Sequence, residues 1–322
     1  MAKKVTSPEH KTHKRTPAEQ VKYVLTHYWQ LYVFMSFSVI YLIIFDYYPM
    51  AGNVLAFKQY DYKLGIWGSP WVGFKHFERF LSNYMFGRLM WNTMRISVLS
   101  SFWGFPVPIL FALCLNAMIH PRYKKTIQTI TYMPHFISTV VMVGILKQFF
   151  NPRAGIYGNV IKMITGKMPG DIFMDPKIFD TLYIGSGIWQ GFGWGSILYL
   201  AALSGVSPEL HEAAAIDGAT RWKRVIHIDV PSILPTITIM LIMNIGSILG
   251  VGYEKIYLMQ TDMNIRVSEV ISTYVYKMGL GSGGRSDYGF STAVSLFNAV
   301  INIFLLIIAN TISRKVGETS LW

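Results

Sequence analysis

Long runs without charge are the feature that most constrains this chain. An α-helix needs roughly 20 mainly apolar residues to cross the hydrocarbon of a bilayer. In lipid, only helices and closed barrels satisfy their own backbone polar groups. Six stretches fit a helix, so the sequence predicts an all-α polytopic membrane protein with about six transmembrane helices, near 31–48, 92–119, 127–150, 182–203, 233–251 and 290–312.

The overall composition supports a membrane protein. Of the 322 residues, 52% are hydrophobic and 14% are charged, whereas soluble domains are about 25% charged. The formal net charge of +12 would suggest nucleic-acid binding in a soluble protein. Here the basic residues gather near the ends of the apolar runs, as membrane topology rules expect. The single cysteine, Cys114, has no partner for a disulfide within the chain.

Basic turns indicate which side of the membrane each loop faces. Residues 120–125 form a compact basic turn, and Arg314 with Lys315 follows the last run. Short loops rich in Lys and Arg stay in the cytoplasm. With six spans, both termini are therefore expected in the cytoplasm.

The loop after the fourth run contains signals for two short helices, which a simple connector would not need. It starts with Ser207, a good N-cap, and Pro208, which suits the first helical position. Gly218 can end this helix in the left-handed conformation, and Thr220 can cap a second one. The residues alone leave two interpretations open: a docking element for a cytoplasmic partner, or a helix lying along the lipid headgroups.

A motif in this loop favours docking. Glu212-Ala213-Ala214, then Asp217-Gly218-Ala219, then Ile228 and Pro231, resembles the EAA loop of binding-protein-dependent ABC importer permeases. The closest resemblance is to the type I carbohydrate branch, which takes up oligosaccharides or polysaccharides. Val230 stands where that family usually has Leu. The resemblance implies that the loop couples to a cleft on an ATP-binding subunit, through Glu212, Ala213, Ala214, Asp217, Gly218 and Ala219.

The resemblance also implies partners and a domain organisation. The expected partners are a second, related permease subunit, two ATP-binding subunits and an extracytoplasmic solute-binding protein. ATP and Mg would bind the partner ATPase, and this chain would bind no cofactor. We expect a basic cytoplasmic tail (1–29), a first transmembrane helix with an extracytoplasmic segment (30–91), an ABC type I core (92–313) with the coupling loop 205–231, and a cytoplasmic tail (314–322), in the plasma (inner) membrane of a prokaryote.

Several catalytic patterns are missing. His211-Glu212 begins a zinc-protease motif, but Ala215 stands where the second His is required. The glycine clusters at 191–195 and 281–284 lack the Lys-Ser/Thr of a phosphate-binding loop. We therefore expect no catalytic residue and no metal site. No charged residue lies deep in a predicted span, which argues against proton- or sodium-coupled transport.

A path for sugar needs aromatic rings, amides and hydroxyls inside the bundle. Six residues in the predicted spans have such groups, and each could instead tie helices together: Gln190, Trp194, Tyr199, Asn244, Ser247 and Asn298. Gly187, Gly191 and Gly195 share a face of the fourth span, either for close helix packing or for a face that opens.

The function predicted from the sequence is the permease subunit of an ATP-driven carbohydrate importer. The same architecture could import a non-sugar solute such as a peptide or phosphate. A membrane-embedded glycosyltransferase would need paired acidic or metal-binding residues at the membrane surface, and no convincing set is present. A pure assembly or receptor protein is a third class, which co-purification with an ATPase would oppose.

Overall fold

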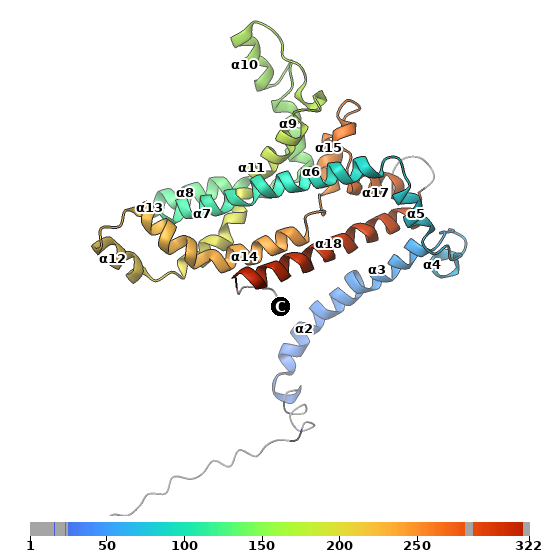
Figure 1. Cartoon of the computed structure of the whole chain (residues 1–322), viewed down its shortest axis with the longest axis horizontal. Helices are drawn as coiled ribbons and strands as arrows, with labels where there is room; N and C mark the ends of the chain where they lie inside the picture. The colour runs from blue at the N-terminus through green and yellow to red at the C-terminus, as the bar shows by residue number, and fades with distance from the viewer. Residues whose placement is uncertain (1–15, 17–22, 24, 281–285, 318–322) are drawn as a thin grey trace, which may run out of the picture. The chain divides into compact units, whose positions relative to one another are not determined.

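The computed structural model describes residues 16, 23, 25–280 and 286–317 (Figure 1). Much of the predicted tail at 1–29 and the last part of the tail at 314–322 lie outside these residues. Within the described ranges there is no strand, and one isolated antiparallel bridge joins Lys58 to Trp71. The all-α prediction is confirmed.

The chain divides into two units, Met1–Val54 and Leu55–Trp322. The first unit contains α2 (Trp29–Leu42), a π-helical turn (Ile43–Tyr47), α3 (Tyr48–Met50) and the start of a 3₁₀-helix (Ala51–Phe57). Together they make a helix from Trp29 to Phe57 that is long and apolar enough to cross a membrane. The helix therefore runs beyond residue 48, where the sequence predicted the first span to end.

Five long helices form the centre of the second unit. They are α6 (Phe86–Gly104), α7 (Pro106–Asn116), α11 (Phe179–Ser204), α14 (Val230–Gly246) and α18 (Tyr288–Gly317). The helix α11 packs along α6 and α7, and α14 packs along α18 (Figure 1). A buried apolar cluster contributed by α7, α11 and α14 includes Leu113, Tyr199 and Ile233, which fixes these helices against one another.

The third predicted span is not straight. Residues 121–149 form α8 (Pro121–Tyr132), the 3₁₀-helix η3 (Met133–Phe136) and α9 (Thr139–Phe149), with a bend of 101°. Pro134 removes a backbone donor near the break. Ser138 then caps the new helix, because its Oγ accepts a hydrogen bond from Val141 N at 3.4 Å.

Four described helices pass a test of length and apolar composition for a membrane span, and the bent pair would make a fifth. The four are Trp29–Phe57, Phe86–Asn116, Arg221–Gly246 and Tyr288–Lys315. The 26-residue α11 is not among them. It contains several glycines and serines, Gln190, and aromatic residues with polar groups.

Short helices lie at the two ends of the second unit. Figure 1 shows α12 (Pro208–Ile216) and α13 (Arg221–Arg224) at one end, and α5 (Lys75–Leu81) and α17 (Ile271–Gly279) at the opposite end. The remaining short elements are α4 (Gly65–Gly68), α10 (Ile156–Thr165), η4 (Ile172–Met174), η5 (Val225–Asp229), α15 (Tyr253–Met259) and α16 (Ile265–Ser268).

One buried amide joins the segments that precede α11 and α17. The Nδ2 of Asn264 donates to Phe173 O at 2.9 Å and to Met259 O at 3.0 Å. Its Oδ1 accepts hydrogen bonds from Thr261 N and Ser268 Oγ, both at 3.0 Å. Both N–H donors and both acceptor lone pairs of this side chain are therefore used, and the residue is only 1% exposed.

We expect Asn264→Ala to lower the thermal stability of the purified protein. Each buried polar group left without a partner costs about 1–3 kcal/mol. The midpoint of thermal unfolding in detergent measures this effect. Asn159→Ala is the matched control, because Asn159 is exposed on α10. Equal midpoints for the two variants would contradict this role of Asn264.

Candidate functional site

The loop between α11 and α14 folds as a helical hairpin, which we call the coupling hairpin (205–231). Ser207 Oγ accepts a hydrogen bond from Glu209 N at 3.3 Å, and Thr220 Oγ1 accepts one from Lys223 N at 3.4 Å. Both predicted caps are therefore confirmed. Gly218 has a φ of 75°, a left-handed conformation that favours glycine. It ends α12 as the sequence predicted.

The coupling hairpin exposes an apolar tip. Ile216 is 87% exposed and Trp222 is 71% exposed. The motif residues divide into two groups: Glu212, Ala213, Asp217 and Gly218 are exposed, while Ala214 and Ala219 are half-buried. Exposed apolar side chains that lie together on a polar surface often mark an interaction site, whereas single exposed apolar residues are common on any protein.

A buried carboxylate fixes the base of the coupling hairpin. Asp229 is 2% exposed, and its Oδ1 lies 3.2 Å from His211 Nε2 on α12. The same oxygen accepts a hydrogen bond at 3.4 Å from Asn116 Nδ2, at the end of α7. Arg224 adds a hydrogen bond of 3.4 Å to the carbonyl of His211. The hairpin is thus tied to the helix bundle through side chains.

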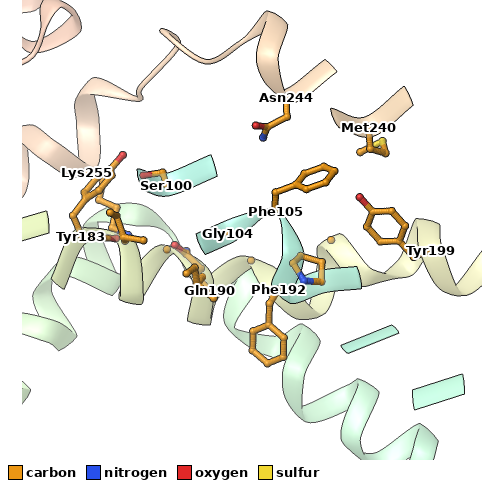
Figure 2. A pocket seen from close by; sticks show the side chains of 16 residues that line it. Ser100, Gly104, Phe105, Tyr183, Gln190, Phe192, Tyr199, Met240, Asn244 and Lys255 are labelled. Carbon is orange, nitrogen blue, oxygen red and sulfur yellow. The ribbon is translucent and has the colours of Figure 1, made fainter. Parts of the chain in front are cut away.

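A second feature is a pocket of about 470 Å³ inside the bundle, which we call the central pocket. It is lined by residues of α6, α7, α11, α14 and α15 and by Phe105 between α6 and α7. Figure 2 shows Lys255 and Tyr183 at one end, and Tyr199 and Met240 at the other. Its volume is in the range of small-molecule sites, about 300–1,000 Å³.

Three of the six predicted path residues line the central pocket: Gln190, Tyr199 and Asn244. Gln190 also ties helices together, since its Nε2 donates to Ile137 O at 2.8 Å. Asn244 Oδ1 accepts a short hydrogen bond from Ser101 Oγ. At Gln190 and Asn244, the side chains thus line the pocket and also join helices through hydrogen bonds, so both interpretations stay open.

The other three predicted residues do not line the central pocket. Trp194 stacks on His135, with ring centroids 4.6 Å apart and planes 2° apart. Ser247 Oγ donates to Met243 O within its own turn, at 3.2 Å. Asn298 Nδ2 donates to Leu249 O at 3.2 Å and so links α18 to the turn that follows α14.

The glycines of α11 have different roles. A Cβ on Gly193 would lie 2.2 Å from Thr131 O, so this glycine permits close contact with α8. A Cβ on Gly195 would lie 3.3 Å from Pro108 of α7. A Cβ on Gly191 would meet nothing within 4 Å, and this glycine lines the central pocket. On the predicted glycine face, Gly195 therefore allows close helix packing, whereas Gly191 leaves open space in the central pocket.

Sequence reasoning missed Lys255, which reaches the central pocket from α15. Its Nζ donates to Tyr183 O at 2.9 Å and lies 4.8 Å from the centre of the Tyr183 ring. A Cβ on Gly187 would lie 3.2 Å from this Nζ, so the glycine leaves room for the ammonium. Burial lowers the pKa of Lys255 to about 8. No sequence pattern marks it, because only the fold brings α15 to α11.

The fold and these two features define a class: a polytopic helical membrane protein with an internal pocket and an exposed docking hairpin. Residues 104–318 match the profile of the family described as "Binding-protein-dependent transport system inner membrane component". The chain belongs to this family. It is therefore a multi-pass transport permease subunit and not an enzyme.

Similar proteins agree with this family. Protein LplB of Bacillus subtilis (strain 168) is 41% identical over 91% of each chain. The polygalacturonan/rhamnogalacturonan transport system permease protein YteP of the same organism is 39% identical, over 91% of this chain and 90% of that protein. A crystal structure of a bacterial ABC transporter "involved in the import of the acidic polysaccharide alginate" matches with a TM-score of 0.83 and 38% identity, over 92% of this chain and 99% of that chain.

The space at Gly191 can be tested separately from the packing at Gly193. We expect Gly191→Phe to fill the central pocket and block transport without preventing assembly, because its side chain starts in open space. Gly193→Ala should instead reduce the yield of folded protein, since its Cβ would clash with a backbone oxygen. Uptake and the yield of monodisperse protein measure the two effects. Normal uptake by Gly191→Phe would show that the pocket is not on the path.

The anchor at Asp229 can be tested by proteolysis. We expect Asp229→Ala to loosen the coupling hairpin, because His211 and Asn116 both lose their acceptor. Trypsin should then cut faster at Arg221, Lys223 or Arg224, measured by mass spectrometry of the fragments. Asp217→Ala, at an exposed carboxylate of the same hairpin, is the control. A rate equal to that of the control would show that the anchor does not hold the hairpin.

Proposed function

We propose that this chain is the permease subunit through which carbohydrate, as an oligosaccharide, crosses the plasma membrane of a prokaryote. The named relatives support this assignment, because they serve polygalacturonan/rhamnogalacturonan and alginate. The central pocket adds physical support. It places amides and a phenol beside the Phe105 and Phe192 rings, and sugars bind such surfaces through hydroxyls and ring faces.

The arrangement in the membrane follows from the predicted topology. Six spans place both termini and the coupling hairpin in the cytoplasm, with the Lys255 end of the central pocket toward the outside. A second permease subunit completes the path, and a solute-binding protein delivers the sugar from outside. Two ATPase subunits bind the cytoplasmic side and hold the ATP and Mg.

The observation that carries this proposal is the exposed tip of the coupling hairpin on an anchored base. Ile216 has almost no cover from its own chain, while Asp229 at the base is buried. An apolar residue presented on a short, fixed helix suits insertion into a groove of a partner. Movement of that partner would then pass through α12 to α7 and α14, because Asp229 holds these elements together.

We expect Ile216→Asp to weaken binding of the ATPase and to stop ATP-driven uptake, because a carboxylate would have to enter an apolar groove. Co-purification of the ATPase subunit with the permease in detergent measures binding. Met163→Asp is the matched control: Met163 is 81% exposed on α10, far along the chain from the coupling hairpin. Full retention of the ATPase by Ile216→Asp would overturn the docking role of the hairpin tip.

A further inference from the structure

Lys255 lies at one end of the central pocket without an acidic partner. Two other basic residues of the second unit have an acidic partner: Lys277 Nζ is 3.0 Å from Glu269 Oε1, and Arg95 Nε is 3.0 Å from Asp180 Oδ2. Within the described part of the chain, no carboxylate oxygen lies within 4.0 Å of Lys255 Nζ. The neutral carbonyl and ring of Tyr183 are its neighbours instead.

A partly buried ammonium without a counter-ion is costly, because burial removes water that stabilises the charge. At neutral pH most Lys255 side chains still carry a proton, since a pKa of about 8 lies above 7. The ammonium has three N–H donors, and Tyr183 O accepts one of them. Two donors therefore remain for a ligand.

The rest of the central pocket suits a sugar. Gln190 and Asn244 bring amides, and Tyr199 brings a phenol. Ser100 also lines it, and its Oγ has no hydrogen-bond partner in the structure. Tyr183 and Tyr199 are 16 positions apart on α11, which corresponds to roughly 24 Å at 1.5 Å per residue. The cation thus lies at one end of a long and otherwise uncharged site, whose apolar walls carry a few polar groups.

We propose that the central pocket selects a carbohydrate that carries carboxylates, and that Lys255 binds a uronate carboxylate at the outer end of the path. This inference rests on the proposed function and adds the substrate class. A carboxylate beside Lys255 would form charge-assisted hydrogen bonds, which are stronger than neutral ones. A neutral sugar would leave the ammonium unpaired, so the same residue would disfavour neutral oligosaccharides.

The test uses the complete importer in proteoliposomes, with its second permease, ATPase and binding protein. The probes are trigalacturonate and its fully methyl-esterified form, which has the same rings but no charge. Initial ATP-dependent uptake is measured for the wild type and each variant. Each variant is compared with the wild type for the same probe. Any preference of the binding protein for one of the two probes therefore cancels from the ratio of the two uptake rates.

We expect Lys255→Met to lower uptake of trigalacturonate by about tenfold or more, the scale of a lost hydrogen bond to a charged group. Uptake of the ester should stay the same or rise. Lys255→Arg should retain most of the uptake of the acid, because it keeps the charge. Lys147→Met, at an exposed lysine of α9 outside the central pocket, should change neither probe.

Carbodiimide coupling gives a readout that does not depend on transport rate. The reagent converts a uronate carboxylate to an O-acylisourea, and the Lys255 amine attacks its carbonyl carbon. A urea leaves with the former carboxylate oxygen, and an amide remains. Mass spectrometry should find the sugar on the peptide that contains Lys255, and not on the peptide that contains Lys147.

Two results would overturn the inference while leaving the importer intact. One is ATP-dependent uptake in which Lys255→Met changes both probes equally or changes neither. The other is no sugar adduct at Lys255 in a complex that transports trigalacturonate. If the wild type takes up no carbohydrate at all, neutral or acidic, both this inference and the proposed function fail.

Discussion

Close contact between helix backbones at α11 is the interaction on which the second unit depends. Because Gly193 has no side chain, the backbone of α8 can approach α11 at Thr131. Gly195 makes room for the side chain of Pro108 on α7. One turn earlier, Gly191 faces space. The same small residues therefore hold the bundle together and leave room for the central pocket. In lipid, where burial of apolar surface gives little driving force between helices, such contacts matter more than in water.

In the function that we propose, energy for transport enters this molecule from outside the bilayer. The described helices that are long and apolar enough to cross a membrane contain few charges, which disfavours a chain of ionisable groups for protons or sodium ions. The coupling hairpin offers the alternative, since it combines an exposed tip with a base that contacts α7 and α12 through one carboxylate. The central pocket extends along α11 from Tyr183 to Tyr199, and the coupling hairpin follows the C-terminal end of the same helix, so α11 connects the two.

Local chemistry made much of this structure predictable from the sequence. Ser207, Thr220 and Gly218 have the roles predicted for them, because caps and left-handed turns depend on a few neighbouring residues. The rotation of each helix against its neighbours is not local. Trp194 and Gln190 share a face by spacing, yet only Gln190 lines the central pocket. Lys255 was missed for the same reason: its place depends on contacts between segments about 70 positions apart.

The break after α14 has a consequence for motion. The backbone N–H of Leu249 donates to Asn302 Oδ1 at 3.1 Å, and its carbonyl accepts from Asn298 Nδ2 at 3.2 Å. Both polar groups that a helix would normally satisfy are thus held by α18. A change in the angle between α14 and α15 at this break would therefore not cost Leu249 its backbone hydrogen bonds. Because α15 packs against α9 and α17, a tilt of α14 would move Asn244 relative to an ammonium that stays on the carbonyl of Tyr183.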